Sequence, residues 1–342
     1  MQIVVRKNFN FIYVKTNKNN LGGKGHMYIG IDLGGTNIAG GLVDENGRIK
    51  YEGSCQTKSH RPPKEIILNI KDLVLEIIEG YGIDKGQVKA IGIGIPGLAD
   101  KDGKVIFCVN LGWKNEPLRE ILEEELDIPV YMDNDATVAA IAEYEYGRMK
   151  GAESAVMLTL GTGIGGGIIL NGKAYSGYNG IGSEIGHMVI GENYYDCNCG
   201  RNGCFETFAS STAIINYTRK LLAQKSTDTV INNLIKGDID KLNAKIIFDA
   251  ARAGDEIGNI AVKRLVKYIG IGIFNIVNLI DPQIIALGGG MANAGQFLLD
   301  LVIEEVLKNK YYKSLPMAKI ALAKLGNEAG IIGAAMLSRH TG

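Results

Sequence analysis

The sequence predicts an α/β protein of two lobes, and three features of its 342 residues support this class. Short apolar runs typical of strands alternate with longer segments that have helical periodicity. One pattern occurs in both halves of the chain: an apolar strand, a turn with Gly and Thr, a second strand and an Asn-Gly turn. The chain also has 46 glycines, nearly twice the usual share of about 7%, and most stand beside apolar runs. We therefore expect two lobes built on one plan, with glycine turns at strand ends.

The first lobe is expected to begin at Met27 with the strand "MYIGIDLGG". Apolar alternation and turn residues predict two further strands, around the hairpin turn "DENG" and in "YEGSCQT". Helical periodicity predicts a helix from about Pro63 to Gly80 and another near Pro117 to Leu126. Between and after them, continuous apolar runs predict the strands "VKAIGIGIPG" and "PVYMDND". Good helix formers then predict a helix in "ATVAAIAEYEYGRM".

The second half repeats the strand, turn and strand in "VMLTLGTGIGGGIILNGKA". A cysteine-rich segment follows, and then helical periodicity predicts three helices, at about Ser211–Gln224, Lys245–Ala253 and Ile257–Ile280. The chain ends with a strand in "PQIIALGGGMA", a helix in "AGQFLLDLVIEEVLKN" and a closing helix in "GIIGAAMLS". This alternation favours an α/β fold over separate all-α and all-β domains.

The predicted organisation has three parts. Residues 1–26 end in "NNLGGKGH" and show no period after the first 15 positions, so we expect an extension that is disordered or not native. Residues 27–134 form the small lobe, on which a C-terminal helix at about 328–342 packs. Residues 135–327 form the large lobe.

Composition excludes several classes of protein. The 37 basic residues balance 37 acidic ones without a basic stripe, so a nucleic-acid partner is not expected. No apolar run reaches the roughly 18 residues of a membrane span, and the N-terminus lacks the pattern of a signal peptide. We expect a cytoplasmic protein without a membrane partner.

Three glycine turns are candidates for phosphate binding, because backbone N–H groups can face a phosphate where no Cβ intervenes. A plain hairpin turn is the alternative for the first of them, "DLGGT", taken alone. Neither GxGxxG at a helix start nor GxxxxGK[ST] is present, and two facing hairpin turns suit ATP between lobes better. The carboxylate at the first turn can also hold Mg²⁺ through water. The candidates are Asp32, Gly34, Gly35, Thr36, Asn37, Gly161, Thr162, Gly163, Gly289 and Gly290.

Asp135 is a candidate general base, because it stands where the strand "PVYMDND" gives way to a helix. Phosphoryl transfer needs positioning and a carboxylate that accepts the hydroxyl proton. Helix capping by Asp133, Asn134 or Asp135 is the alternative, and the two interpretations are compatible.

Three of the five cysteines lie within eight positions, in "CNCGRNGC". In a reducing compartment such a cluster favours metal binding or catalysis over disulfides. His187 with Cys197, Cys199 and Cys204 offers the four N and S ligands of a closed tetrahedral Zn²⁺ site. The spacing is not a common zinc-finger one, and loose thiols remain the alternative.

The motifs "DLGGT", "GIGIPG", "NLGW", "DNDA", "LGTGIGGG", "GSEIGH" and "CNCGRNGCFE", in this order, resemble the ROK family of sugar kinases and repressors. The resemblance runs from Met27 nearly to the C-terminus, and "NLGW" with "CNCGRNGCFET" is similar to its glucokinase branch. It implies an actin-like (ribonuclease H-like) fold with an ATP and sugar cleft between lobes. It also implies ATP with Mg²⁺, a structural Zn²⁺ and a homodimer. The repressors carry an N-terminal DNA-binding domain, for which 26 residues leave no room.

The resemblance implies a role for each polar motif residue. Asp135 would take the proton of the sugar 6-hydroxyl, and Asn134 would hydrogen-bond the sugar. The hexose pocket would be lined by Asn110, Glu184, His187 and Glu206. Glucose is the expected substrate. A kinase for N-acetylmannosamine, fructose or allose, and a sugar-sensing regulator without catalysis, are the alternatives.

Overall fold

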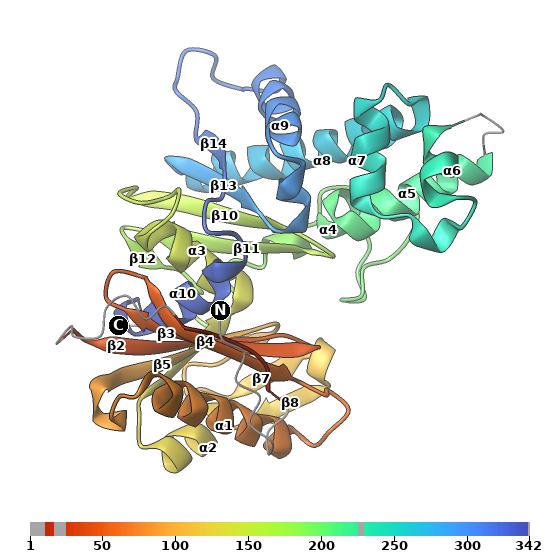
Figure 1. The fold of residues 1–342 in the computed structure, drawn as a ribbon. Coiled ribbons are helices and arrows are strands. Elements are labelled where there is room, and N and C mark those ends of the chain that lie inside the picture. Colours follow the sequence, from red (N-terminus) through yellow and green to blue (C-terminus); the bar gives the residue numbers. More distant parts are fainter. Residues whose placement is uncertain (1–10, 17–24, 225–228, 341–342) are drawn as a thin grey trace. The chain divides into compact units, whose positions relative to one another are not determined.

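The structure, a computed structural model, describes residues 11–16, 25–224 and 229–340 (Figure 1). Strands and helices alternate along the described chain, which confirms the predicted α/β class. Within these ranges no helix has both the length and the apolar character that a bilayer span requires.

The chain forms two compact units. Unit 1 comprises the described residues up to Glu153, Gly167–Ser183 and those from Lys324 onward; unit 2 comprises Ser154–Gly166 and Glu184–Ala323. The helix after residue 134 belongs to unit 1, whereas the sequence analysis assigned it to the large lobe. The lobe boundaries from the sequence analysis, 27–134 and 135–327, stay a prediction.

Unit 1 contains a six-stranded mixed sheet of order β1-β4-β3-β2-β5-β9. The neighbours β2, β5 and β9 run parallel, whereas β1, β4, β3 and β2 pair antiparallel. Because β2, β5 and β9 run parallel, their carboxyl ends lie side by side, and the candidates Asp32 and Asn134 stand at these ends. The strands are β1 Phe11–Thr16, β2 Met27–Leu33, β3 Asn37–Asp44, β4 Ile49–Gln56, β5 Val88–Ile95 and β9 Val130–Asn134.

Strand β1 lies within the N-terminal extension, where the sequence analysis expected disorder. Its backbone pairs antiparallel with β4, with Val14 opposite Gly53. The reason is that the outer edge of β4 offers unpaired N–H and C=O groups to a further strand. Residues 1–10 and 17–24 of the extension lie outside the described residues, and its native origin stays a prediction.

Helices cover both faces of this sheet (Figure 1). Gly40 of β3 faces Leu73 and Ile77 of α1, while its neighbour Gly41 faces Ile331 of α10. Successive strand residues point to opposite faces, so α1 and α10 lie on opposite sides of the sheet. Helix α3 packs beside α10. The helices are α1 Pro63–Tyr81, α2 Leu118–Leu126, α3 Asp135–Glu145 and α10 Ala329–Met336.

A small antiparallel sheet that the sequence analysis did not predict follows β5. It consists of β6 Leu98–Ala99, β7 Val105–Cys108 and β8 Trp113–Glu116. A 3₁₀ turn, Val109–Leu111, joins β7 to β8 and carries the exposed Asn110. These strands have two to four residues each, which is too short for a recognisable period.

The second sheet has the order β12-β11-β10-β13-β14, in which β10, β13 and β14 run parallel. The helices predicted for the second half are present within one or two residues of their expected ends, except that the C-terminal helix, expected at about 328–342, ends at Met336. The strands are β10 Ser154–Leu160, β11 Ile164–Leu170, β12 Lys173–Ala174, β13 Ile284–Gly288 and β14 Lys319–Leu322. The helices are α4 Glu206–Ala209, α5 Ser211–Gln224, α6 Val230–Ile235, α7 Ala244–Arg252, α8 Glu256–Ile280 and α9 Gln296–Lys308.

Glycines let α10 lie directly on the backbone of the first sheet. A Cβ at Gly30 of β2 would overlap the carbonyl of Ile331, and one at Gly92 of β5 would overlap the carbonyl of Ala334. On the other side of α10, a Cβ at Gly333 would overlap the carbonyl of Val138 in α3. Part of the glycine excess thus serves close packing of backbone on backbone.

We expect Gly92→Ala to lower the free energy of unfolding by about 2–4 kcal/mol, because α10 must move off the sheet to admit a methyl group. Urea unfolding followed by circular dichroism measures the change. Gly86→Ala is the matched control, since a Cβ at Gly86 meets no atom within 4 Å. Equal stabilities of the two variants would contradict the close packing of α10.

Candidate active site and metal centre

Two aspartates occupy the ends of parallel strands in unit 1. Asp32 of β2 lies opposite Gly94 of β5, and Gly94 lies opposite Asp133 of β9. Residues opposite one another in neighbouring strands point to the same face, so both carboxylates project from one face with a glycine between them. This face is the one that α3 covers, because a Cβ at Gly94 would contact Val138.

The Asp32 carboxylate is partly buried and has no counter-charge among the described residues. Burial raises the pKa of its carboxyl above the ordinary value. The backbone of α10 approaches at Gly330, and the hydrogen bonds and ion pairs found among the described residues include none to the Asp32 side chain. A bound cation would offset this uncompensated burial, so the donor suits Mg²⁺, which prefers carboxylate and water oxygens.

The glycine turn that follows Asp32 is fixed by a residue that sequence analysis missed. Gly34 N–H donates to the Asn37 carbonyl at 3.0 Å, which closes the turn. Buried Thr57 donates its hydroxyl to the Gly34 carbonyl at 2.6 Å and its N–H to the Thr36 carbonyl at 2.8 Å. Thr57 is remote in sequence, and no motif marks it. The turn brings Gly35 close to Asn110, whose Cβ would lie 3.4 Å from a Cβ on the glycine.

The three polar side chains of "DND", residues 133–135, have different surroundings. Asn134 caps α3, because its side-chain oxygen accepts the Ala136 N–H at 2.9 Å, and its amide donates to the Gly97 carbonyl at 3.2 Å. Asp133 accepts the Ser176 hydroxyl at 2.6 Å and the Asn134 N–H at 2.7 Å. Burial raises the pKa of Asp133, and these two hydrogen bonds oppose the rise. Asp135 is the exposed first residue of α3.

The glycine turns of unit 2 meet at the ends of two parallel strands. Thr159 of β10 lies opposite Gly288 of β13, and Gly289, with φ of +79°, packs against the Leu160 backbone. The turn after β10 is tied to the start of α5. Ser211 N–H donates to the Gly161 carbonyl at 2.8 Å, and the Thr212 hydroxyl to that of Thr162 at 2.7 Å. The predicted phosphate-binding glycines of this unit are Gly161–Gly163 and Gly289–Gly290. They follow the carboxyl ends of the neighbouring parallel strands β10 and β13.

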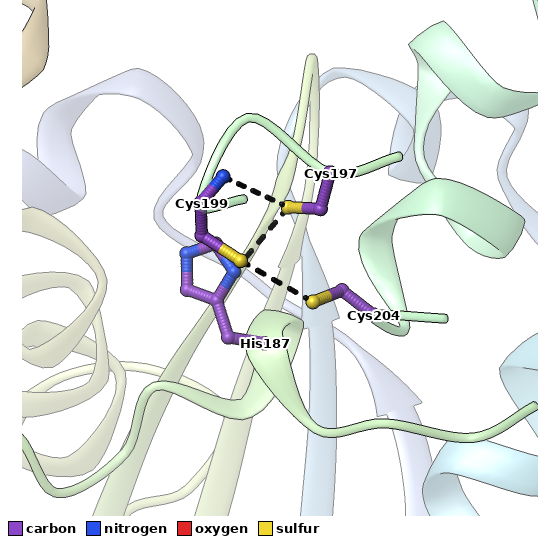
Figure 2. Close-up of side chains that lie close together, drawn as sticks. All are labelled: His187, Cys197, Cys199 and Cys204. Carbon is purple, nitrogen blue, oxygen red and sulfur yellow. Dashed lines mark hydrogen bonds between the residues drawn. The ribbon is translucent and has the colours of Figure 1, made fainter. Parts of the chain in front are cut away.

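Four side chains converge in the cysteine-rich segment of unit 2 (Figure 2). One ligand atom from each of His187, Cys197, Cys199 and Cys204 lies within 4.8 Å of the others. The Cys197 Sγ to His187 Nδ1 distance is 3.6 Å and the Cys199 Sγ to Cys204 Sγ distance is 3.5 Å. A zinc–sulfur bond of about 2.3 Å requires tetrahedral edges of roughly 3.8 Å, so the donor set fits this ion with small adjustments.

One cysteine of the cluster is prepared to be a thiolate. Desolvation raises the pKa of Cys199, but hydrogen bonds from Arg201, Cys197 and Cys204 together lower it to about 6. Thiolate is the form that binds metal. The cluster can therefore bind a metal ion.

Glu206 joins the cluster to the neighbouring polar candidates. Its Oε1 accepts the Cys197 thiol at 3.0 Å and lies 3.8 Å from His187 Nδ1. Desolvation and the nearby Glu206 carboxylate raise the pKa of Glu184, and the proximity of His187 opposes the rise. Gly163 lies against the Glu206 carboxylate. Unit 2 thus brings together its predicted sugar residues, cysteines and first glycine turn, and it also holds Gly289 and Gly290, whereas the remaining candidates belong to unit 1.

Comparisons with known proteins agree with these features. The sequence profile of the ROK family matches residues 28–341. A glucokinase of Halalkalibacterium halodurans is 36% identical over 315 residues, which cover 92% of this chain and 95% of that protein. A xylose repressor of Caldicellulosiruptor bescii is 30% identical over 89% of this chain but only 76% of its own length.

The fold is similar to solved structures of the same kind. A ROK family glucokinase of Streptomyces griseus, solved in complex with glucose and AMPPNP, superposes with a TM-score of 0.78. It is 34% identical in sequence, with coverage of 92% of this chain and 99% of that one. These similarities confirm the predicted actin-like α/β fold.

Proposed function

Because the chain belongs to the ROK family, we propose that it is an ATP-dependent glucokinase. It transfers the γ-phosphoryl group of ATP to the 6-hydroxyl of glucose. The observation that carries this function is its similarity, over nine tenths of both chains, to glucokinases that include one solved with glucose and AMPPNP. The site residues found in the two units supply the groups that the reaction needs.

Asp135 is the general base in this proposal. It stands at the first position of α3, directly after the end of β9. Asn134 holds the helix start through its capping bond, and Asp133 is occupied by Ser176. Asp135 is the second aspartate of the family motif "DNDA", and we assign to it the role of accepting the proton of the attacking hydroxyl.

The remaining candidates bind and orient the two substrates. Asn110, Asn134, Glu184, His187 and Glu206 hydrogen-bond the sugar hydroxyls, which need donors and acceptors at several angles. The backbone of the glycine turns faces the phosphates of ATP. The Asp32 carboxylate would hold Mg²⁺, which would supply positive charge to the phosphates of ATP.

The His/Cys cluster is proposed to hold a structural Zn²⁺. His187 Nδ1 faces the cysteines, which leaves Nε2 for a sugar hydroxyl or a carboxylate. Glu206 touches the cluster as well, so both residues connect metal and sugar. The ion would order the sugar pocket and take no part in phosphoryl transfer.

We also propose a cytoplasmic location and a homodimer for the chain, with no nucleic-acid or membrane partner. The five cysteines are free thiols, as expected in a reducing compartment. The similarity to the C. bescii repressor keeps a sugar-sensing regulator as a second candidate.

A panel of hexoses with ATP, followed by coupled ADP release, tests the function. Glucose should have the highest kcat/KM among glucose, fructose, allose, mannose and N-acetylmannosamine. A tenfold lead of another sugar would replace the substrate, and binding of a sugar without turnover would favour the regulator.

Asp135→Asn should still bind glucose but lose about 10²- to 10⁴-fold in kcat, because an amide cannot accept the proton. Steady-state kinetics with calorimetric glucose binding separates the two effects. Asp133→Asn is the matched control, with a loss of kcat below about tenfold and a lower melting temperature, since its carboxylate holds Ser176. Retained turnover in Asp135→Asn would remove this residue from the role of base.

Cys199→Ser should lose zinc and weaken glucose binding together, because the cluster shares His187 and Glu206 with the sugar pocket. ATP binding should change little. Elemental analysis beside calorimetry with each ligand measures both. Cys108→Ser is the control, since Cys108 lies in unit 1, outside the cluster. A zinc-free variant with normal glucose affinity would disprove the link.

A further inference from the structure

Arg264 of α8 lies among three aromatic rings of unit 2. Its guanidinium carbon lies 4.5 Å from the ring centre of Tyr217, 4.9 Å from that of Tyr268 and 5.4 Å from that of Phe208. Cation–π attraction to several rings holds a guanidinium in place more firmly than a single contact does. These three contacts restrain the position of the Arg264 guanidinium beside α8.

The Arg264 guanidinium contacts the chain before and after the cysteine-rich segment, residues 197–204. One terminal nitrogen donates to the Phe208 carbonyl in α4 at 3.5 Å, and the other donates to the Asn193 side-chain oxygen at 3.4 Å. Asn193 precedes the first cysteine of the cluster, and Phe208 follows the last. Arg264 thus ties the two ends of the segment to one helix.

Asn193, which accepts a hydrogen bond from Arg264, also bonds to α4. Its amide donates to the Thr207 carbonyl at 2.6 Å, and the Tyr195 hydroxyl donates to the same oxygen at 2.6 Å. Thr207 in turn donates its hydroxyl to the Cys204 carbonyl at 2.7 Å. The residue beside Thr207 is Glu206, whose carboxylate contacts Cys197.

We propose that Arg264 is a positioning residue for the sugar site: through Asn193 and the Phe208 carbonyl it sets the place of α4 and hence of the Glu206 carboxylate. The four-residue helix α4 has few internal hydrogen bonds, and burial of Phe208 and Ala209 fixes its apolar side, so the bonds to its carbonyl groups set its remaining orientation. The His/Cys cluster holds the segment at one side and Arg264 holds it at the other. This inference rests on the proposed role of Glu206 as a sugar ligand.

Arg264→Lys tests the proposal, because lysine keeps the charge among the rings but lacks the planar fork that reaches two acceptors. We expect the KM for glucose to rise roughly three- to tenfold, in keeping with the loss of one or two charged hydrogen bonds. The kcat, the KM for ATP and one bound metal per chain should stay within about twofold of wild type, because Arg264 touches neither Asp135 nor a cysteine.

Arg252→Lys is the matched control. Arg252 also stacks on a ring, that of Phe297 at 4.9 Å, and donates to a carbonyl, that of Ala294 at 2.7 Å, but it lies on α7 and contacts neither the cysteine-rich segment nor α4. Its replacement should lower stability by a similar amount without a change in the KM for glucose. Asn193→Ala provides a second variant on the same path, and its effect should not add to that of Arg264→Lys.

Hydrogen–deuterium exchange supplies a readout that is independent of turnover. Exchange across residues 205–210 should be faster in Arg264→Lys and unchanged in Arg252→Lys. A lower melting temperature with unaltered glucose KM and unaltered exchange at 205–210 would overturn the proposal. Wild type is assayed first, so the kinetic comparison uses the hexose that it phosphorylates. If wild type phosphorylates none, the proposed function fails, and exchange alone decides whether Arg264 holds α4.

Discussion

The direct contact between the α10 backbone and the backbones of β2 and β5 is the constraint on which unit 1 depends. Gly30 and Gly92 permit it, since any side chain there would occupy the space of a helix carbonyl. Helix α10 also packs against α3, so one short apolar helix sets the distance between the sheet and the helix that begins at Asp135. The positions of Asp32, Asp133 and Asp135 therefore depend on contacts between glycines and helix backbone, and not on contacts of the charged residues themselves.

Polar contacts then give each acidic side chain a different chemical state. Ser176 and the Asn134 N–H bond the Asp133 carboxylate, which makes it a structural group. Asp32 is partly buried without such partners among the described residues, and this burial raises the pKa of its carboxyl. Asp135 is exposed at a helix N-terminus. Three carboxylates of the same type thus suit three tasks, and their surroundings alone separate them.

In unit 2 the sugar candidates depend on a segment with little regular structure. Buried Phe205 and Phe208 anchor the start and the inner side of α4, whereas the turns and isolated bridges before it have little regular structure and need other restraints. The His/Cys cluster and the contacts of Arg264 act at different places on the segment. Glu206 lies between these two restraints, which accounts for a defined carboxylate position on a four-residue helix.

The sequence by itself determined the α/β class, the order of the long elements and the motif residues, because periodicity and turn chemistry are local properties. The ligand set of the His/Cys cluster was also predictable, since three of its members lie within eight positions. Tertiary structure alone decided the edge strand β1, which depends on the free edge of β4. It also decided the partners that fix the site, such as Thr57 on the Gly34 turn and Arg264 on α4. Each of these residues acts across more than 20 positions, and a contact between distant segments leaves no period or spacing in the sequence.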